Sequence, residues 1–77
     1  MPVYNSYTTV EIFRTDVHDE ITASEVVSRL LVTFPGATIN FDLEDCDRIL
    51  RVEADYVDTS KIISLLKVME IRCIPLS

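Results

Sequence analysis

Three adjacent polar side chains in the first third of the chain are of types that bind metal ions. His18, Asp19 and Glu20, within the segment DVHDEITASE, supply one imidazole and two carboxylates, a set suited to a divalent ion such as zinc. Adjacent residues rarely converge on one ion, whereas carboxylates that precede a helix stabilise its N-terminal dipole by about 0.3–1 kcal/mol each. We therefore favour a helix-start role and expect no metal here, with these three residues as the ligands of an alternative metal site.

A second group of acidic side chains lies between two strand-like segments. Asp42, Glu44, Asp45 and Asp47 offer oxygen ligands of the kind that calcium prefers. A calcium-binding EF-hand loop also needs an interior glycine and a distal glutamate at fixed spacing, and neither stands at the required position. We interpret these side chains as solvated carboxylates of a hairpin turn.

The two cysteines have neither a disulfide framework nor the C-x-x-C spacing of a zinc site. Cys73 lies in a strand-like run and is predicted to be buried, whereas Cys46 lies in a polar loop and is predicted to be exposed. With one histidine, one glycine, no nucleophile elbow and no phosphate-binding loop, the chain is poorly equipped for catalysis. We expect a non-enzyme that has no cofactor.

Length and composition restrict the class of protein further. Seventy-seven residues, 48% of them hydrophobic, predict a single small domain over residues 1–77, with residues 1–6 as a loose tail. The net charge of −6 has the wrong sign for attraction to phosphate backbones or anionic lipid. No basic leader and no apolar run of roughly 20 residues is present. We therefore expect a cytoplasmic protein that binds neither nucleic acid nor membranes.

The first element that positions these residues is a strand predicted at Tyr7–Arg14, a run rich in β-branched and aromatic residues. Its alternation predicts that Val10 and Ile12 lie on the buried face. The same pattern turns Thr9, Glu11 and Phe13 to the other face.

A helix is predicted to follow this strand. Thr22 and Glu25 have the S/T-x-x-E spacing of a capping box, so the helix should begin at Ala23. Apolar residues then recur in steps of three and one, which holds one stripe on a 3.6-residue period. Pro35 and Gly36 end the helix, because the residue before a proline disfavours helical geometry.

The second half of the chain predicts two strands, a helix and a last strand. The two strands are Thr38–Leu43 and Arg48–Ala54, which alternate apolar and polar residues across a short loop. Asp58 is the predicted N-cap of the next helix. Its apolar stripe consists of Ile62, Leu65, Leu66 and Met69. The last strand is Ile71–Leu76, where Pro75 indicates an edge position.

This order of elements, β-α-β-β-α-β, predicts an α+β domain. Right-handed crossovers place both helices on one face of a four-stranded antiparallel sheet, which is the ferredoxin-like sandwich. The usual order of its strands, counted along the chain, is 4-1-3-2, and this order puts the last strand at an edge.

The chain resembles the heavy-metal-associated (HMA) domain of small copper chaperones and of metal-transporting P-type ATPases, over roughly residues 9–76. In that family a first strand leads to a loop of the form G-M-x-C-x-x-C and then to a helix that ends at a Leu-Pro-Gly-like step, for which this chain has Phe34, Pro35 and Gly36. The later segments that match the family are FDL at 41–43, ILRVE at 49–53 and VDTSKI at 57–62. The resemblance implies the same ferredoxin-like fold.

The two metal-binding cysteines of that family are absent from this chain. Aligned back from the Pro-Gly step without gaps, Glu20 and Ala23 take the cysteine positions. A one-residue slip, which matches Thr15–Val17 to family loops resembling T-N-I-x-C, places Asp19 and Thr22 there instead. Soft thiolates select Cu(I), so either alignment implies that the copper chemistry of the family is lost.

A further departure from the family is Glu70, which stands where the family usually has a glycine after the second helix. Either the turn is reshaped or Glu70 adopts a left-handed conformation at a cost of roughly 1 kcal/mol. The sequence leaves both possibilities open.

The sheet face away from the helices is the remaining candidate surface, because neither loop chemistry nor catalysis is expected. On it, Phe13 and Ile49 are predicted to form a small apolar patch beside Arg51. The full predicted face consists of Thr9, Glu11, Phe13, Asn40, Asp42, Ile49, Arg51 and Glu53. A partner protein or a second copy would bind this face or an edge strand.

The leading hypothesis is a non-catalytic HMA-like domain that has lost the copper-binding cysteine pair and acts as a protein-interaction or regulatory module. The first alternative is a divalent metal-binding or metal-trafficking protein that uses His18, Asp19 and Glu20. The second alternative is a small-molecule sensor of the ACT type that acts as a dimer.

Overall fold

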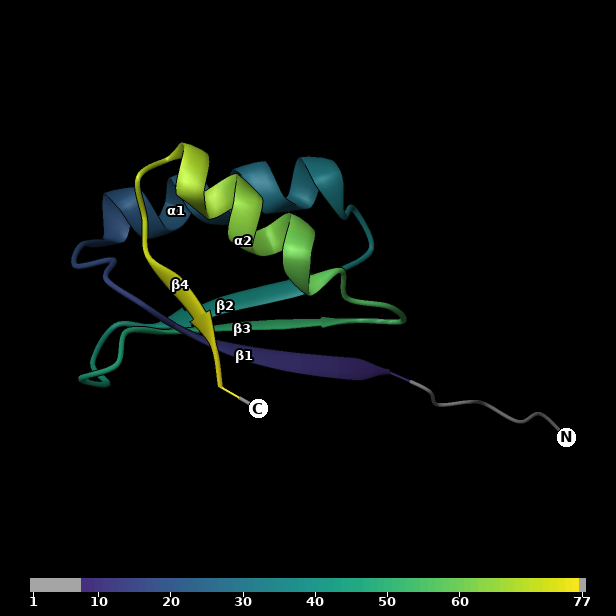
Figure 1. Ribbon diagram of the computed structural model, residues 1–77, viewed down its shortest axis with the longest axis horizontal. Coiled ribbons are helices and arrows are strands. Elements are labelled where there is room, and N and C mark those ends of the chain that lie inside the picture. The colour runs from purple at the N-terminus through teal and green to yellow at the C-terminus, as the bar shows by residue number, and fades with distance from the viewer. Residues whose placement is uncertain (1–7, 77) are drawn as a thin grey trace, which may run out of the picture.

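The computed structural model describes residues 8–76 and has a four-stranded sheet covered on one face by two helices (Figure 1). The elements in chain order are β1 (Thr9–Thr15), α1 (Glu20–Thr33), β2 (Thr38–Asp42), β3 (Ile49–Ala54), α2 (Thr59–Val68) and β4 (Cys73–Pro75). The tail predicted at residues 1–6 lies outside the described residues.

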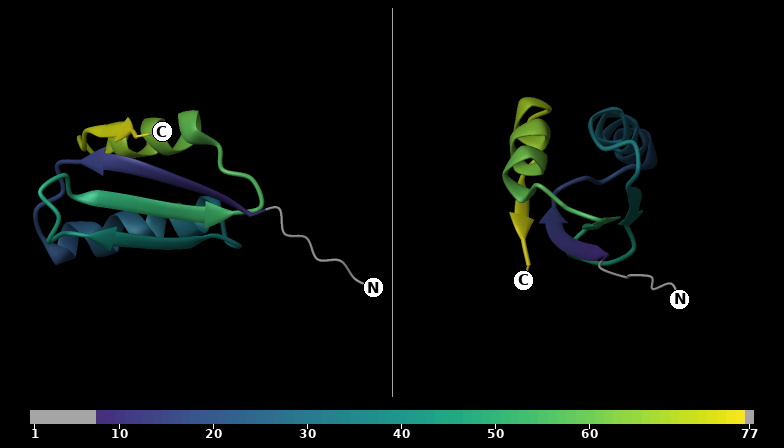
Figure 2. Two further views of the ribbon diagram at one scale, coloured as in Figure 1. Left: turned by 90° about the horizontal axis from the view of Figure 1, so that it is seen from below. Right: turned by 90° about the vertical axis from the view of Figure 1, so that its right-hand side faces the viewer.

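All strand pairs are antiparallel, and the sheet order is β2-β3-β1-β4. This arrangement confirms the predicted α+β ferredoxin-like fold, including the edge position of the strand that contains Pro75. Figure 2 shows α1 beside the β2 edge and α2 beside the β4 edge, and no helix or strand of residues 8–76 covers the opposite face of the sheet. The uncovered face is called the open face below, and β2 and β4 are the two edge strands of the sheet.

The face assignment predicted for β1 was wrong. Phe13 is fully buried, whereas Val10 is 41% exposed. Phe13 lies directly opposite Leu50, which is also fully buried, and opposed residues of antiparallel strands share a face. Phe13 therefore belongs to the core, and Val10 and Ile12 belong to the open face. Each of the two alternating sets of side chains in β1 contains apolar residues, so the alternation alone does not show which set is buried.

The core lies between the helices and the sheet and draws on every element. Its largest fully buried side chains are Phe13, Leu30, Leu50, Ile62 and Leu66. The predicted stripe of α2 is confirmed in its centre, where Ile62 and Leu66 are both 0% exposed. The predicted cap is also present, because the Asp58 side chain accepts a hydrogen bond from the Lys61 amide at 3.1 Å.

The start of α1 differs from the prediction by three residues. The helix begins at Glu20, and Asp19 is its N-cap, with an extended backbone and a side chain that accepts from the Thr22 amide at 2.7 Å. The capping box predicted for Thr22 does not form. Aspartate at the N-cap is preferred over threonine, so the earlier residue takes the role. Glu25 lies 3.5 Å from the Arg29 guanidinium, one turn further along the helix.

The turn after α2 resolves the two possibilities for Glu70. This residue has a φ of 64°, in the left-handed region that favours glycine. The Glu70 amide donates to Lys67 O and the Ile71 amide donates to Leu66 O, both at 2.9 Å, which is the hydrogen-bond pattern of a Schellman motif. Ile71 and Leu66 are both buried, so the motif also has its usual apolar contact.

Replacement of Glu70 by glycine should stabilise the protein. Glycine adopts a positive φ without the steric cost that a Cβ atom brings, so the free energy of unfolding should rise by about 1 kcal/mol in Glu70→Gly. Urea unfolding followed by circular dichroism measures this difference. Glu70→Gln, which removes the charge and retains the strain, is the control and should stay within about 0.5 kcal/mol of wild type. A glycine variant no more stable than the glutamine variant would contradict the assignment of strain.

Candidate functional site

The loop between β1 and α1 is anchored to the β2–β3 hairpin. The Thr15 hydroxyl donates to Arg48 O at 2.7 Å and accepts from the Val17 amide at 3.2 Å. The Thr15 amide donates to Asp47 O at 3.1 Å. Thr15 is itself buried, and its hydroxyl group is satisfied by this network. The loop is thus fixed at its first residues, with the Val17 side chain in the core.

Both aspartates of this loop are engaged by the backbone. Asp16 accepts a hydrogen bond from the Arg72 amide at 2.9 Å, which ties the loop to the start of β4. Asp19 caps α1 through the Thr22 amide. Hydrogen bonding to Thr22 lowers the pKa of Asp19 below its ordinary value, with a smaller contribution from the nearby His18. These carboxylates therefore have structural roles, and His18 and Glu20 are exposed beside them.

The structure does not gather His18, Asp19 and Glu20 around a common point. Within residues 8–76, the group of three potential ligands whose donor atoms lie within 4.8 Å of one another is Asp45, Cys46 and Asp47. Sequence reasoning treated Asp45 and Asp47 as turn carboxylates and Cys46 as a separate loop thiol. The hairpin turn brings the three side chains together, and only the geometry of the turn could have indicated that they lie so close.

The hydrogen bonds of the hairpin account for this group. The Asp45 side chain accepts from the Asp47 amide at 2.8 Å, and its backbone oxygen accepts from the Arg48 amide at 3.0 Å. Asp47 also lies 3.8 Å from the Arg14 guanidinium. An aspartate that bonds to a backbone amide two residues later is typical of a tight turn. The acidic side chains thus shape the turn, as their interpretation as turn carboxylates requires.

The two cysteines have the environments that the sequence predicts. Cys46 is exposed, Cys73 is buried, and both are free thiols. Burial raises the pKa of Cys73 to about 11, so its thiol is protonated at neutral pH and is unsuited to nucleophilic chemistry or metal binding. Cys46 is therefore the thiol of this pair that solvent can reach.

The open face carries an aliphatic patch that sequence reasoning placed incorrectly. Ile74 lies opposite Arg14, and the Leu76 amide donates to Ile12 O at 2.8 Å, which places Leu76 beside Ile12. We define the open-face patch as Val10, Ile12, Ile74 and Leu76; of these, Val10, Ile74 and Leu76 are 41%, 38% and 42% exposed. The alternation of the last strand, with Cys73 inward, was the available signal for Ile74 and Leu76.

Thr9 and Glu11, also predicted for this face, alternate with Val10 and Ile12 and lie on the helix side with Phe13. The predicted residues of β2 and β3 do lie on the open face, beside the patch. Ile49 is half-buried and lies opposite both Arg14 and Asp42. Arg51 lies opposite Ile12 and forms an ion pair with Glu53 at 3.1 Å. Ile49 and Arg51 thus remain part of the predicted surface, whereas Phe13 is absent from it because its side chain fills the core.

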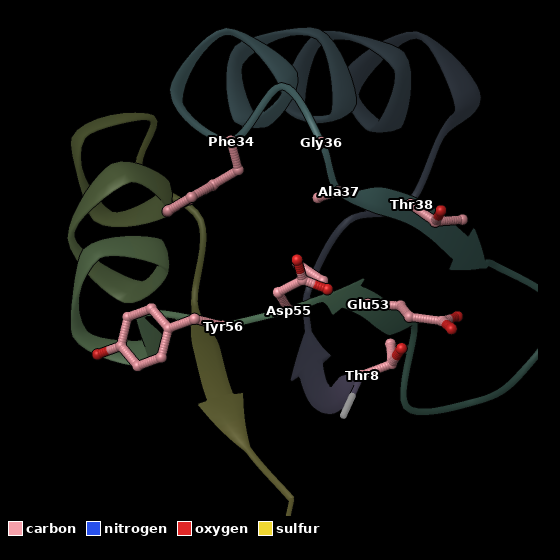
Figure 3. A pocket seen from close by; sticks show the side chains of 9 residues that line it. Thr8, Phe34, Gly36, Ala37, Thr38, Glu53, Asp55 and Tyr56 are labelled. Atoms are coloured by element: carbon pink, nitrogen blue, oxygen red, sulfur yellow. The ribbon is translucent and has the colours of Figure 1, made fainter. Parts of the chain in front are cut away.

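A cavity of about 390 Å³ lies at the end of the sheet opposite the β1–α1 loop, where α1 leads into β2 (Figure 3). Its lining includes Phe34, Ala37, Asp55 and the largely exposed Tyr56. Among the described residues that line it there are two carboxylates and no histidine, cysteine, lysine or arginine. The lining thus lacks an acid–base pair of the type that most catalytic sites use.

Comparisons with known proteins add no relative. No protein-family model, curated protein or solved structure matches this chain. Neither of the helices in the described part of the chain is long and apolar enough to cross a membrane. Function must therefore be argued from the surfaces and the loop described above.

The lowered pKa of Asp19 predicts a loss of stability in acid. An aspartate whose pKa is lower in the folded than in the unfolded chain stabilises the fold above its unfolded pKa of about 3.9, and this contribution disappears as the pH falls through the folded pKa. Asp19→Asn lacks the contribution, so wild type should be the more stable at pH 6 and the difference should shrink toward pH 2. Unfolding by urea across this pH range measures it.

Asp55→Asn is the control for this titration, because Asp55 is an exposed aspartate at the other end of the sheet. The free energy of unfolding of Asp55→Asn should stay closer to that of wild type at every pH. A stability difference between wild type and Asp19→Asn that does not change between pH 6 and pH 2 would show that the Asp19 charge has no part in the cap.

Proposed function

We propose that this chain is a non-catalytic, HMA-like domain that works by binding another protein through the open face of its sheet. The open-face patch carries this proposal, because it exposes aliphatic surface on the adjacent chain segments of β1 and β4. Arg14, Arg51 and Glu53 border it with charge. An apolar centre with a polar rim is typical of protein interaction sites.

The β1–α1 loop supports the absence of copper chemistry in this proposal. The buried Val17 fits the alignment that matches it to the apolar residue of T-N-I-x-C loops. In that alignment Asp19 and Thr22 occupy the two cysteine positions, and they are joined by the cap hydrogen bond of 2.7 Å. Where HMA domains place two sulfur ligands, this chain has a pair that closes the first turn of a helix, and neither member is a soft ligand for Cu(I).

The alternative function, a divalent metal site at His18, Asp19 and Glu20, has less support. The Asp19 carboxylate already accepts from the Thr22 amide, and metal binding there would compete with the helix cap. The described structure also leaves the three side chains without a common centre, as noted above.

A substitution at the centre of the patch tests the proposal. Ile12 lies between Arg51 and Leu76 across the strands, so Ile12→Lys places a charge where a partner would bury apolar surface. The protein, immobilised, is exposed to a lysate of its source organism, and retained proteins are quantified by mass spectrometry. Proteins that bind through this face should be depleted about tenfold or more by Ile12→Lys, because an unpaired charge in an interface costs more than about 1.4 kcal/mol.

The matched control is Ile21→Lys, because Ile21 is 83% exposed on α1 and lies away from the sheet face. It should retain the same proteins as wild type. Sedimentation velocity of all three proteins shows whether the retained partner is a second copy of the chain. Identical sets of retained proteins from wild type and Ile12→Lys, with both folded by circular dichroism, would overturn the proposal.

Titration with Cu(I) tests the loop separately. The wild-type protein, reduced and kept free of oxygen, should show no tight equivalent in isothermal titration calorimetry, because the two-thiolate site that Cu(I) requires is absent from residues 16–23. The same titration with Zn²⁺, repeated on His18→Ala, tests the alternative. One tight equivalent of Cu(I) at this loop would contradict the proposal, and zinc binding that weakens sharply in His18→Ala would favour the alternative.

A further inference from the structure

The two edges of the sheet differ in their capacity to accept another strand. At the β4 edge, the backbone of Pro75 points away from β1, and Pro75 has no amide hydrogen to offer an added strand. The β2 edge, Thr38–Asp42, contains no proline and no basic side chain. Natural proteins use proline and lysine to protect edges, so β2 is the unprotected edge of this sheet.

The hydrogen-bond phase of the sheet shows which backbone groups lie on that edge. The Leu76 amide donates to Ile12 O, so the amide and carbonyl groups of even-numbered β1 residues point toward β4. Those of odd-numbered β1 residues point toward β3. Val52 of β3 lies opposite the odd-numbered Glu11, so its backbone groups bond to β1 and those of the next residue, Arg51, point toward β2. Asn40 lies opposite Arg51, so the backbone groups of Asn40 point toward β3. The amide and carbonyl groups of Ile39 and Phe41 therefore point outward, in the spacing that an added strand requires.

A groove runs beside this edge, between β2 and the first turns of α1. Its volume is about 460 Å³, and its apolar lining comes from Ala23 of α1, Phe41 of β2 and Leu43. Side chains of a strand alternate between its two faces, so every second side chain of a strand added to β2 would point toward α1 and into this groove. The small Ala23 side chain leaves room for an apolar group of the added strand.

The rim of the groove is acidic. Glu20, Asp42 and Glu44 line it, and all three are exposed. In the part of the chain that the structure describes, the ion pairs are Arg14–Asp47, Arg29–Glu25 and Arg51–Glu53, so none of them neutralises this rim. A partner segment with lysine or arginine would supply the opposite charge.

A second copy of the chain fits this edge less well than a basic segment does. Its own β2 strand has the sequence TINFD and brings no cation, while each copy adds a net charge of −6. Association of two such chains at an acidic rim is opposed by charge, whereas an oppositely charged partner is attracted.

We infer that the β2 edge binds an extended basic segment of another protein as a fifth strand, with an apolar side chain in the groove beside Ala23 and lysine or arginine side chains at Glu20, Asp42 and Glu44. Pairing of this kind obtains affinity from backbone hydrogen bonds and specificity from alternate side chains. This site is separate from the open-face patch, and the two can be tested independently.

Nuclear magnetic resonance of the full chain gives the sharpest test. The probe is a hexapeptide of alternating valine and lysine, acetylated and amidated at its ends. At saturating peptide, hydrogen exchange of the Ile39 and Phe41 amides should slow at least tenfold, while that of Asn40, already paired with β3, should change little. The same peptide methylated at every backbone nitrogen keeps its charges but donates no hydrogen bond, and it should give no protection.

Two variants of equal net charge test the acidic rim. The triple variant Glu20→Gln, Asp42→Asn and Glu44→Gln should bind the peptide about tenfold more weakly at low salt, since three exposed ion pairs together approach that factor. The control triple variant Glu25→Gln, Asp55→Asn and Glu70→Gln removes the same charge outside the groove and should bind within about twofold of wild type. Ile12→Lys should bind the peptide as wild type does, whatever its effect on the open face.

Three results would overturn the inference. One is equal weakening in both triple variants, which means attraction by net charge alone. Another is peptide binding that does not depend on backbone hydrogen bonds: either the methylated peptide binds as well as the unmodified one, or the unmodified one does not bind. The third is a dimer of the protein alone whose Ile39 and Phe41 amides are already protected, which would assign the edge to a second copy. None of these results bears on the Ile12→Lys test of the open face.

Discussion

The burial of Phe13 is the constraint on which the surfaces of this protein depend. Successive side chains of a strand point to opposite faces, so one buried residue decides the orientation of the whole strand. With Phe13 packed against the helices opposite Leu50, Val10 and Ile12 have no place in the core. Full burial of a phenylalanine contributes about 1.5–3 kcal/mol, and the alternative phase would expose this ring to water. The aliphatic patch on the open face is the direct consequence.

The β1–α1 loop is held in place by the side chains of its own residues. Val17 fills the core, Asp16 binds the backbone at the start of β4, and Asp19 caps α1. Each of these side chains holds the loop in place through a contact with another part of the chain. The thiol that solvent can reach, Cys46, belongs to the neighbouring hairpin, where it lies near Asp45 and Asp47. A loop built in this way is suited to stability and to presenting the adjoining surfaces.

The open face and the β2 edge differ in the kind of contact they offer. The open-face patch is aliphatic and relies on the exclusion of water, an effect that salt does not screen. The β2 edge offers backbone hydrogen bonds and an acidic rim, so binding there should weaken as salt screens the charges. The edge strands differ from each other for a local reason, since Pro75 blocks an outward amide of β4 and no residue of β2 does so.

The sequence by itself determined the number and order of the elements, because the stripes of both helices, the Asp58 cap and the alternation of β2 and β3 are local patterns with one reading each. It also placed the last strand at an edge through Pro75 and limited Glu70 to two conformations. Only the tertiary structure decided the phase of β1, the residue that caps α1 and the membership of the open-face patch. Each of those choices had two locally acceptable answers: Phe13 or Ile12 inward, Asp19 or Thr22 as the cap. Packing against Leu50 selected Phe13. The contacts of Thr15 and Val17 hold the chain just before Asp19, so the helix begins there and Asp19 caps it.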